Sequence, residues 1–193
     1  DRLRSRGLGD VYKRQIPGGH RVGLAGHVVY EHGAVKTMRY LSGLNIRISH
    51  EIKGCSDKLM PFVVLNTVIL PTLIIAPPGG GKTTLLRDFV RNLSRQCNVA
   101  VVDERSEIAG CYMGISQRDL GSFCDVLDGC KKADGVRMMI RSMAPQVVAV
   151  DEIGTSEDIA ALSYALTSGC SLLATIHCLL YTSPSPRDRS LSR

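Results

Sequence analysis

Apolar runs alternate with amphipathic stretches over residues 60–177 of this chain. Buried strands of a parallel sheet read as short apolar runs, and a helix usually crosses back over the sheet after each one. The runs lie at 68–75, 98–103, 146–150 and 171–177, and the helical stretches at 85–95, 133–143 and 156–166. Residues 110–127 are punctuated by Gly and Asp and are expected to be irregular. The pattern predicts an α/β domain with a mainly parallel sheet.

Residues 16–59 have a different pattern, in which apolar and polar residues alternate as they do in half-buried strands. Residues 21–30 and 34–41 are expected to form a hairpin, and residues 44–49 a further half-buried strand. Residues 54–58 read as a linker. We interpret this region as the remnant of a small N-terminal α/β domain.

A glycine-rich motif directly follows the first apolar run. It reads Ala76-Pro77-Pro78-Gly79-Gly80-Gly81-Lys82-Thr83-Thr84. A strand, a glycine loop, Lys-Thr and a helix, in that order, are typical of a P-loop, whose backbone N–H groups and helix N-terminus bind phosphate. We expect the motif to bind ATP, with Lys82 at the β- and γ-phosphates and the Thr83 hydroxyl on Mg²⁺. Ala76 replaces a glycine of the pattern, which is tolerable where φ is negative. An ordinary glycine turn before a helix is the alternative.

Two apolar runs end in an Asp-Glu pair, Asp103-Glu104 and Asp151-Glu152. In a P-loop ATPase one such Asp helps to hold Mg²⁺ through water, and the adjacent Glu orients and deprotonates the attacking water. We favour Asp151 for the metal and Glu152 for the base, because four consecutive apolar residues precede them.

Asp103, Glu104 and Glu107 form a second acidic cluster, expected at the same sheet edge. There Asp103 would assist the metal, and Glu104 is the next candidate for the catalytic base. Helix capping and surface pairing are the structural alternative. His177 ends the last run and is a candidate for sensing the γ-phosphate, with a buried, hydrogen-bonded strand-end histidine as the alternative.

The two ends of the chain can be encoded by one DNA element read on opposite strands. A DNA that encodes residues 5–15 reads, on its complementary strand and one base out of frame, as residues 178–187. The element resembles a transposase-type sequencing adapter. We therefore interpret residues 1–15 and 178–193 as translated adapter, and natural coding sequence there in the raw DNA reads would contradict this. Without strands beyond His177, the chain as written is expected to be poorly soluble and inactive.

The net charge of the chain is much smaller once these two ends are set aside. The formal net charge is +6, of which residues 1–15 supply +3 and residues 178–193 supply +2, so the remainder carries +1. A nucleic-acid or membrane-surface partner is therefore not indicated by the basic pI. The cysteines show no zinc-type spacing, and no apolar stretch is long enough to span a bilayer.

Several segments together resemble the stage III sporulation protein AA family over nearly all of residues 16–177. They read GGHRVGLAG from Gly18, VVDERSEI from Val101, DVLD from Asp125, IRSMAPQV from Ile140 and VDEIG from Val150. That family is similar to the type II and type IV secretion traffic ATPases, where a Walker A loop, an Asp box, a Walker B strand and a His box surround the nucleotide. The resemblance assigns residues 103–107 to the Asp box, Asp151-Glu152 to Walker B and residues 175–177 to the His box. The family's N- and C-terminal portions are not present in this chain.

The resemblance implies a RecA-like P-loop ATPase that forms homo-oligomers, in particular hexamers. It would work on the cytoplasmic, mother-cell side of an endospore-forming bacterium, peripherally attached to the membrane through channel proteins that it energises. The remaining charge of +1 and the few aromatic residues argue against a nucleic-acid partner.

Phosphoryl transfer also calls for an arginine finger from a neighbouring subunit, with Arg105, Arg137 and Arg141 as unranked candidates. Arg47 is a candidate for contacting a neighbour's nucleotide. Two other readings are a RecA-like motor that depends on nucleic acid and a nucleotide-gated assembly scaffold without turnover. A small-molecule phosphotransferase is less favoured, because no acceptor site or lid is evident.

Overall fold

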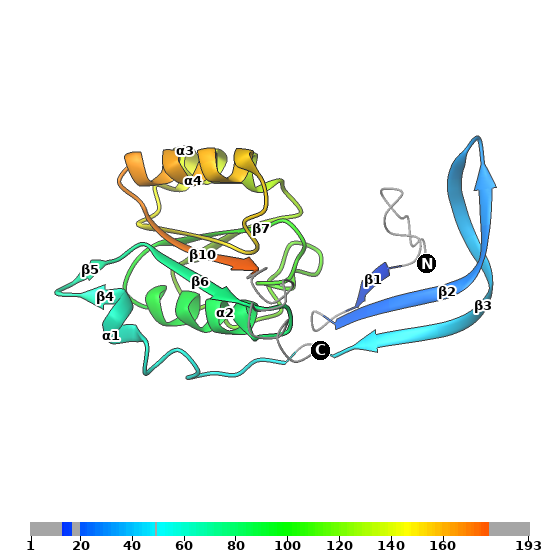
Figure 1. Ribbon diagram of the computed structural model, residues 1–193, viewed down its shortest axis with the longest axis horizontal. Helices are drawn as coiled ribbons and strands as arrows, with labels where there is room; N and C mark the ends of the chain where they lie inside the picture. Colours follow the sequence, from blue (N-terminus) through cyan, green and yellow to red (C-terminus); the bar gives the residue numbers. More distant parts are fainter. Residues whose placement is uncertain (1–12, 17–19, 49, 178–193) are drawn as a thin grey trace, which may run out of the picture. The chain divides into compact units, whose positions relative to one another are not determined.

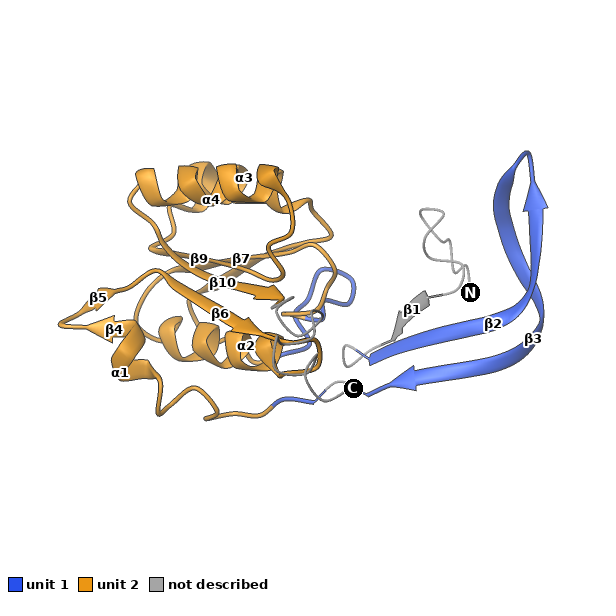
Figure 2. Cartoon of the chain, viewed as in Figure 1, with its two compact units in different colours: residues 1–51, 110–118 blue, residues 52–109, 119–193 orange. Residues whose placement is uncertain are grey.

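The computed structural model describes residues 13–16, 20–48 and 50–177 of the chain. The chain divides into two compact units, residues 1–51 with 110–118 and residues 52–109 with 119–193 (Figure 2). Because the description covers residues 13–177 with two gaps, most of the two terminal segments that we interpret as adapter-encoded lies outside it. Residues 13–15 are described and belong to a strand.

Unit 2 is an α/β unit built on a parallel sheet. Its elements are α1 (Met60–Val63), β4 (Val64–Leu65), β5 (Val68–Ile69), β6 (Thr72–Ala76), α2 (Lys82–Leu93), β7 (Val99–Asp103), β8 (Cys124–Asp128), α3 (Lys132–Met143), β9 (Val147–Val150), α4 (Ser156–Thr167) and β10 (Ser171–His177). Five strands form one sheet in the order β6-β10-β9-β7-β8, and every neighbouring pair is parallel. Helix α2 lies on one face of this sheet, and α3 and α4 lie on the other (Figure 1). The expected α/β fold class is confirmed.

The centre of the sheet forms the core because its strands are apolar on both faces. All residues of β7 and β9 are buried. Helix α3 comes very close to β7 at Gly135, where an added Cβ would lie 2.4 Å from a methyl carbon of Val102. Helix α4 begins with a capping box, in which the Thr155 hydroxyl accepts from the backbone N–H of Asp158. None of the described helices combines the length and apolar character needed to cross a bilayer.

The segment before the glycine loop differs from the single strand expected at 68–75. Pro71 interrupts it, because proline has no N–H to donate to a ladder. The residues before Pro71 form β5, which pairs antiparallel with β4. Strand β6 pairs with β10 and lies at an edge of the described sheet, so Leu73 and Ile75 are 49% and 59% exposed rather than buried.

A second difference lies in residues 110–127, which were expected to be irregular. Residues 124–128 form β8, which pairs with β7 in register from Val99↔Cys124 to Asp103↔Asp128. The sequence did not suggest this strand because it lies at a sheet edge and is only partly buried.

Unit 1 contains an antiparallel sheet of three strands in the order β1-β2-β3. The strands are β1 (Lys13–Ile16), β2 (His20–Glu31) and β3 (Ala34–Arg47). The expected hairpin is confirmed, and it turns through His32 and Gly33, which both have positive φ. The described residues of the region 16–59 form strands up to Arg47, followed by turns and unassigned backbone, and none of them is helical, so the helical part of the expected small α/β remnant is not seen there.

Residues 44–49 do not form the separate half-buried strand that was expected. Strand β3 continues to Arg47, because its pairing with β2 extends past Gly43 to the pair Arg21↔Arg47. Leu44 and Ile46 are 66% and 60% exposed. The alternating pattern therefore predicted strand structure correctly here, but the apolar side chains that it placed on a half-buried face are exposed.

The expected linker at 54–58 is bound to α2 by the buried carboxylate of Asp88. This carboxylate accepts hydrogen bonds from the backbone N–H groups of Gly54 and Ser56, from the Ser56 hydroxyl and from the Arg91 guanidinium. This contact explains why the two units divide at residue 51, whereas the sequence had suggested a division at residue 59.

Replacing Asp88 by asparagine should make the free energy of unfolding less dependent on acid pH. Burial alone would raise the pKa of Asp88, but hydrogen bonds from Ser56, Arg91 and Gly54 outweigh it and lower the pKa from 3.8 to about 2. The ionised form thus stabilises the folded state at neutral pH by about 2 kcal/mol, and this is lost as the pH falls from about 4 to about 2. Urea unfolding at pH 7 should show about this loss in Asp88→Asn, with the gap to wild type closing near pH 2. A gap that stays constant with pH would contradict this assignment.

Candidate functional site

The glycine loop has the backbone geometry that its residue types suggest. Ala76 is the last residue of β6 and has extended backbone, which alanine adopts without strain. Gly79 and Gly81 have φ of 76° and 78°, and a Cβ on Gly80 would lie 3.0 Å from the Pro77 carbonyl oxygen. Gly81 is the N-cap of α2, and no side chain caps this helix end. The N–H groups of its first turn are therefore available to an anion.

The Lys82 side chain folds back over this loop. Its ammonium donates to the carbonyl oxygens of Ala76 and Pro77, at 3.0 Å each, and lies 2.9 Å from Nδ1 of His177. The lysine is 6% exposed. Phosphate oxygens can replace the contacts with Ala76 and Pro77, because each is a single hydrogen bond to an uncharged carbonyl oxygen.

Thr83 and Asp151 meet beside the loop, as expected for a magnesium site. The Thr83 hydroxyl donates to Oδ2 of Asp151 at 2.6 Å. A hydroxyl and a carboxylate suit Mg²⁺, which commonly takes its remaining ligands from phosphates and water. No group of three or more His, Cys, Asp or Glu side chains in the described part of the chain forms a complete metal site. The Thr83 hydroxyl and the Asp151 carboxylate fit a metal that takes its remaining ligands from a bound nucleotide and water.

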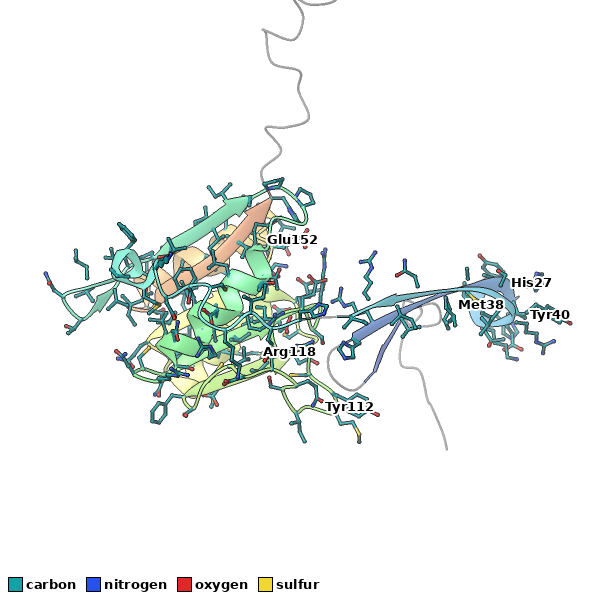
Figure 3. All side chains as sticks on the ribbon, turned by 90° about the horizontal axis from the view of Figure 1, so that it is seen from below. His27, Met38, Tyr40, Tyr112, Arg118 and Glu152 are labelled. Atoms are coloured by element: carbon teal, nitrogen blue, oxygen red, sulfur yellow. The ribbon has the colours of Figure 1, made fainter. Side chains whose placement is uncertain are left out.

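Glu152 follows Asp151 and adopts a conformation that is unusual for a non-glycine residue. Its φ is 51°, a left-handed geometry that costs about 1–3 kcal/mol and is common at functional sites. Its carboxylate contacts Arg105 through Oε2 and lies 3.2 Å from Nε2 of His177 through Oε1. Figure 3 shows Glu152 near the carboxyl end of β10, the strand that ends in His177. The structure thus brings the predicted base next to His177, which also contacts Lys82.

A cavity of about 600 Å³ lies beside Glu152. Glu104, Arg105, Lys132 and His177 contribute to its walls. Glu104 also lines the cavity, and its carboxylate forms an ion pair with Lys132 at 2.5 Å, as that of Glu152 does with Arg105. Glu152 is therefore the better placed of the two candidate bases, because it joins the cavity to the lysine of the glycine loop through His177.

Asp103 has a different environment from the one that the sequence suggested. It is 2% exposed, and its carboxylate accepts the backbone N–H groups of Glu107, Ile108 and Ala109 at 2.8–2.9 Å. Burial and the nearby Asp128 raise the pKa of Asp103, although these three hydrogen bonds oppose the shift. The geometry assigns Asp103 to anchoring the loop at 104–109 rather than to Mg²⁺.

The same loop is also held by Arg87, a residue that the sequence did not single out. The guanidinium of Arg87, on α2, donates to the carbonyl oxygens of Ile108 and Glu107, at 2.7 Å each. An arginine within the helical stretch at 85–95 was the only sequence signal for this role. Of the three finger candidates, Arg105 contacts Glu152, whereas Arg137 and Arg141 are exposed on α3. Arg47 is exposed at the end of β3 in unit 1.

Replacing Asp103 by asparagine is expected to lower stability without changing the Mg²⁺ requirement for nucleotide binding. An amide offers one acceptor oxygen in place of two, so at least one of the three buried N–H groups loses its acceptor, which costs about 1–3 kcal/mol. Asp151→Asn is the matched comparison, because that carboxylate contacts Thr83. A Mg²⁺ titration of nucleotide binding should shift in Asp151→Asn and not in Asp103→Asn. An equal shift in both variants would return Asp103 to the metal site.

Comparison with known sequences identifies relatives for nearly the whole chain. The family model described as "Sporulation stage III, protein AA" matches residues 12–189. The curated protein "Stage III sporulation protein AA" of Bacillus subtilis (strain 168) is 51% identical over 168 residues, which cover 84% of this chain and 54% of that protein. The chain therefore spans about half the length of this relative.

Comparison with solved structures supports the same fold. The ATPase DotB of Legionella pneumophila matches with a TM-score of 0.57 at 18% identity, over 89% of this chain and 49% of that chain. The pilus retraction motor PilT, solved with bound ADP, matches with a TM-score of 0.57 at 15% identity, over 89% of this chain and 50% of that chain. At these identities the likeness is one of fold.

Proposed function

Because this chain belongs to the sporulation stage III protein AA family, we propose that it is the core of an ATPase that binds Mg²⁺·ATP at residues 76–84 and hydrolyses its γ-phosphate. One observation carries the proposal. Lys82, the Thr83–Asp151 pair and the Glu152–His177 pair meet where strands β6, β9 and β10 end. In parallel sheets ligands bind at this end of the strands.

Each residue has a distinct part in the proposed reaction. The loop N–H groups and the α2 N-terminus hold the phosphates, and Lys82 exchanges its contacts with Ala76 and Pro77 for phosphate oxygens. Thr83 and Asp151 would hold Mg²⁺, Asp151 through water, and the metal would neutralise charge on the phosphates. Glu152 accepts a proton from the attacking water, and His177, between Lys82 and Glu152, senses the γ-phosphate.

The wider role that we propose is supported by the family rather than by the site. The chain would act as a hexamer on the cytoplasmic, mother-cell side of the sporulating cell. It would be attached peripherally to the membrane by the channel proteins that it energises. A neighbouring subunit would supply an arginine finger to complete the charge stabilisation.

The proposal is tested by measuring Mg²⁺·ATP binding and phosphate release by the full-length protein that contains this chain, with and without DNA. Phosphate release that DNA leaves unchanged supports the proposal. Release that depends on DNA favours a nucleic-acid motor. Tight binding of Mg²⁺·ATP without phosphate release favours a nucleotide-gated scaffold.

A further inference from the structure

Thr175 is a fully buried hydroxyl residue at the centre of the candidate site. It is 0% exposed and lies in β10, between the strand that leads into the glycine loop and the strand that leads into Asp151. Thr175 pairs with Ile74 of β6, and the preceding Ala174 pairs with Val150 of β9. This register places the Thr175 hydroxyl beside the residues that follow β9.

The hydroxyl of Thr175 contacts both acidic residues of the site with a single oxygen atom. It donates to Oδ1 of Asp151 and accepts the backbone N–H of Glu152 at 2.8 Å. The Thr175 carbonyl oxygen accepts the backbone N–H of Ile153, also at 2.8 Å. One residue therefore holds three consecutive positions of the segment after β9.

These contacts act on the two groups that the proposed reaction needs. The other carboxylate oxygen of Asp151 accepts the Thr83 hydroxyl, so the bond from Thr175 fixes the orientation in which Asp151 faces Thr83. The bond to the Glu152 N–H lies next to the backbone dihedral that has the left-handed value of 51°. This dihedral directs the Glu152 side chain toward Arg105 and His177.

We infer that Thr175 is a positioning residue that sets the Mg²⁺-supporting carboxylate and the water-activating carboxylate together. This inference rests on the proposed ATPase function. A hydroxyl can donate and accept at one atom, whereas a valine of the same shape can do neither. The β-branched side chain also restricts χ1, which keeps the oxygen directed at the two partners.

Thr175→Val and Thr175→Ser separate the hydroxyl from the shape of the side chain. In the full-length protein, Thr175→Val is expected to lower kcat by about 10- to 100-fold, because small misplacements of catalytic groups cost about this much. The KM for ATP should change far less, since Lys82 and the glycine loop are untouched. The Mg²⁺ concentration that half-saturates nucleotide binding should rise. Thr175→Ser should restore both properties to near wild type.

A second threonine provides a matched control for the loss of a hydroxyl. The hydroxyl of Thr167 bonds to backbone carbonyl groups within α4 and is exposed. Thr167→Val should therefore leave kcat and the Mg²⁺ dependence unchanged. If Thr175→Val does not fold, Thr175→Cys replaces it, because a thiol keeps the size of serine and is a much weaker hydrogen-bonding group.

The outcomes distinguish this inference from the proposed function. Wild-type kcat and Mg²⁺ dependence in Thr175→Val, or an equal loss in Thr175→Ser, would overturn the role of the hydroxyl and leave the ATPase proposal standing. If the wild-type protein binds nucleotide without hydrolysing it, the ATPase proposal fails. The Mg²⁺ dependence of binding then decides the role of Thr175, with a shift in the valine variant supporting it and no shift overturning it.

Discussion

Replacing Glu152 by glutamine is expected to lower ATP turnover by about 10²- to 10⁴-fold, the usual contribution of a general base. Glutamine keeps the size of the side chain but has no carboxylate to accept a proton from water. The residues that contact the phosphates in the proposed site, chiefly Lys82 and the glycine loop, are unchanged. ATP binding should therefore persist, and the variant should accumulate bound, unhydrolysed ATP.

Glu104→Gln is the informative comparison for this variant. Glu104 lines the same cavity, but it is paired with Lys132 and no contact joins it to the glycine loop through His177. Its loss should reduce turnover much less than the loss of Glu152. Phosphate release by both variants, measured at saturating ATP, checks this ranking. Normal ATP turnover by Glu152→Gln, together with no turnover by Glu104→Gln, would instead assign the role of the base to Glu104.

Replacing Lys82 by alanine should weaken ATP binding itself. The ammonium is nearly buried and lies at the loop that would surround the phosphates. Removing one partner of a buried charge pair costs about 2–5 kcal/mol, which corresponds to about 30- to 5,000-fold in affinity.

Titration with a fluorescent ATP analogue measures this effect, and Lys58→Ala provides the control. Lys58 is an exposed lysine of the same unit, outside the glycine loop. Its replacement should leave affinity within about twofold of wild type, as expected for an exposed residue away from the site. Equal affinity in Lys82→Ala and wild type would mean that nucleotide binds elsewhere on the molecule.

The sequence predicted those parts of the fold that depend on local pattern. Strands β7 and β9 are buried on both faces, and such strands read as uninterrupted apolar runs. Strand β8 was not predicted, because an edge strand needs no such apolar run. Strand β6 was predicted to be buried but is partly exposed, because apolar residues also occur on exposed edge strands. The order of strands depends on non-local pairing, which a single sequence does not encode in a readable pattern.

The candidate site likewise contains residues that the sequence predicted and contacts that it did not predict. Lys82, Thr83, Asp151 and Glu152 were predicted because each belongs to a short motif at the end of a strand. The hydrogen bonds of Asp103 were not predicted, because they depend on how the loop at 104–109 folds back onto the Asp103 carboxylate. The contacts of Thr175 were not predicted either, since the register of β10 against β9 determines them.

In the proposed site, Lys82 binds the phosphates of ATP and Glu152 activates the attacking water. We would test this by measuring phosphate release and retained nucleotide together for the full-length wild type, Lys82→Ala and Glu152→Gln at saturating Mg²⁺·ATP. We expect steady phosphate release by the wild type only, with unhydrolysed ATP retained by Glu152→Gln and no retained nucleotide in Lys82→Ala. If the wild type releases no phosphate, or if both variants release it at the wild-type rate, this site does not hydrolyse ATP in the proposed way.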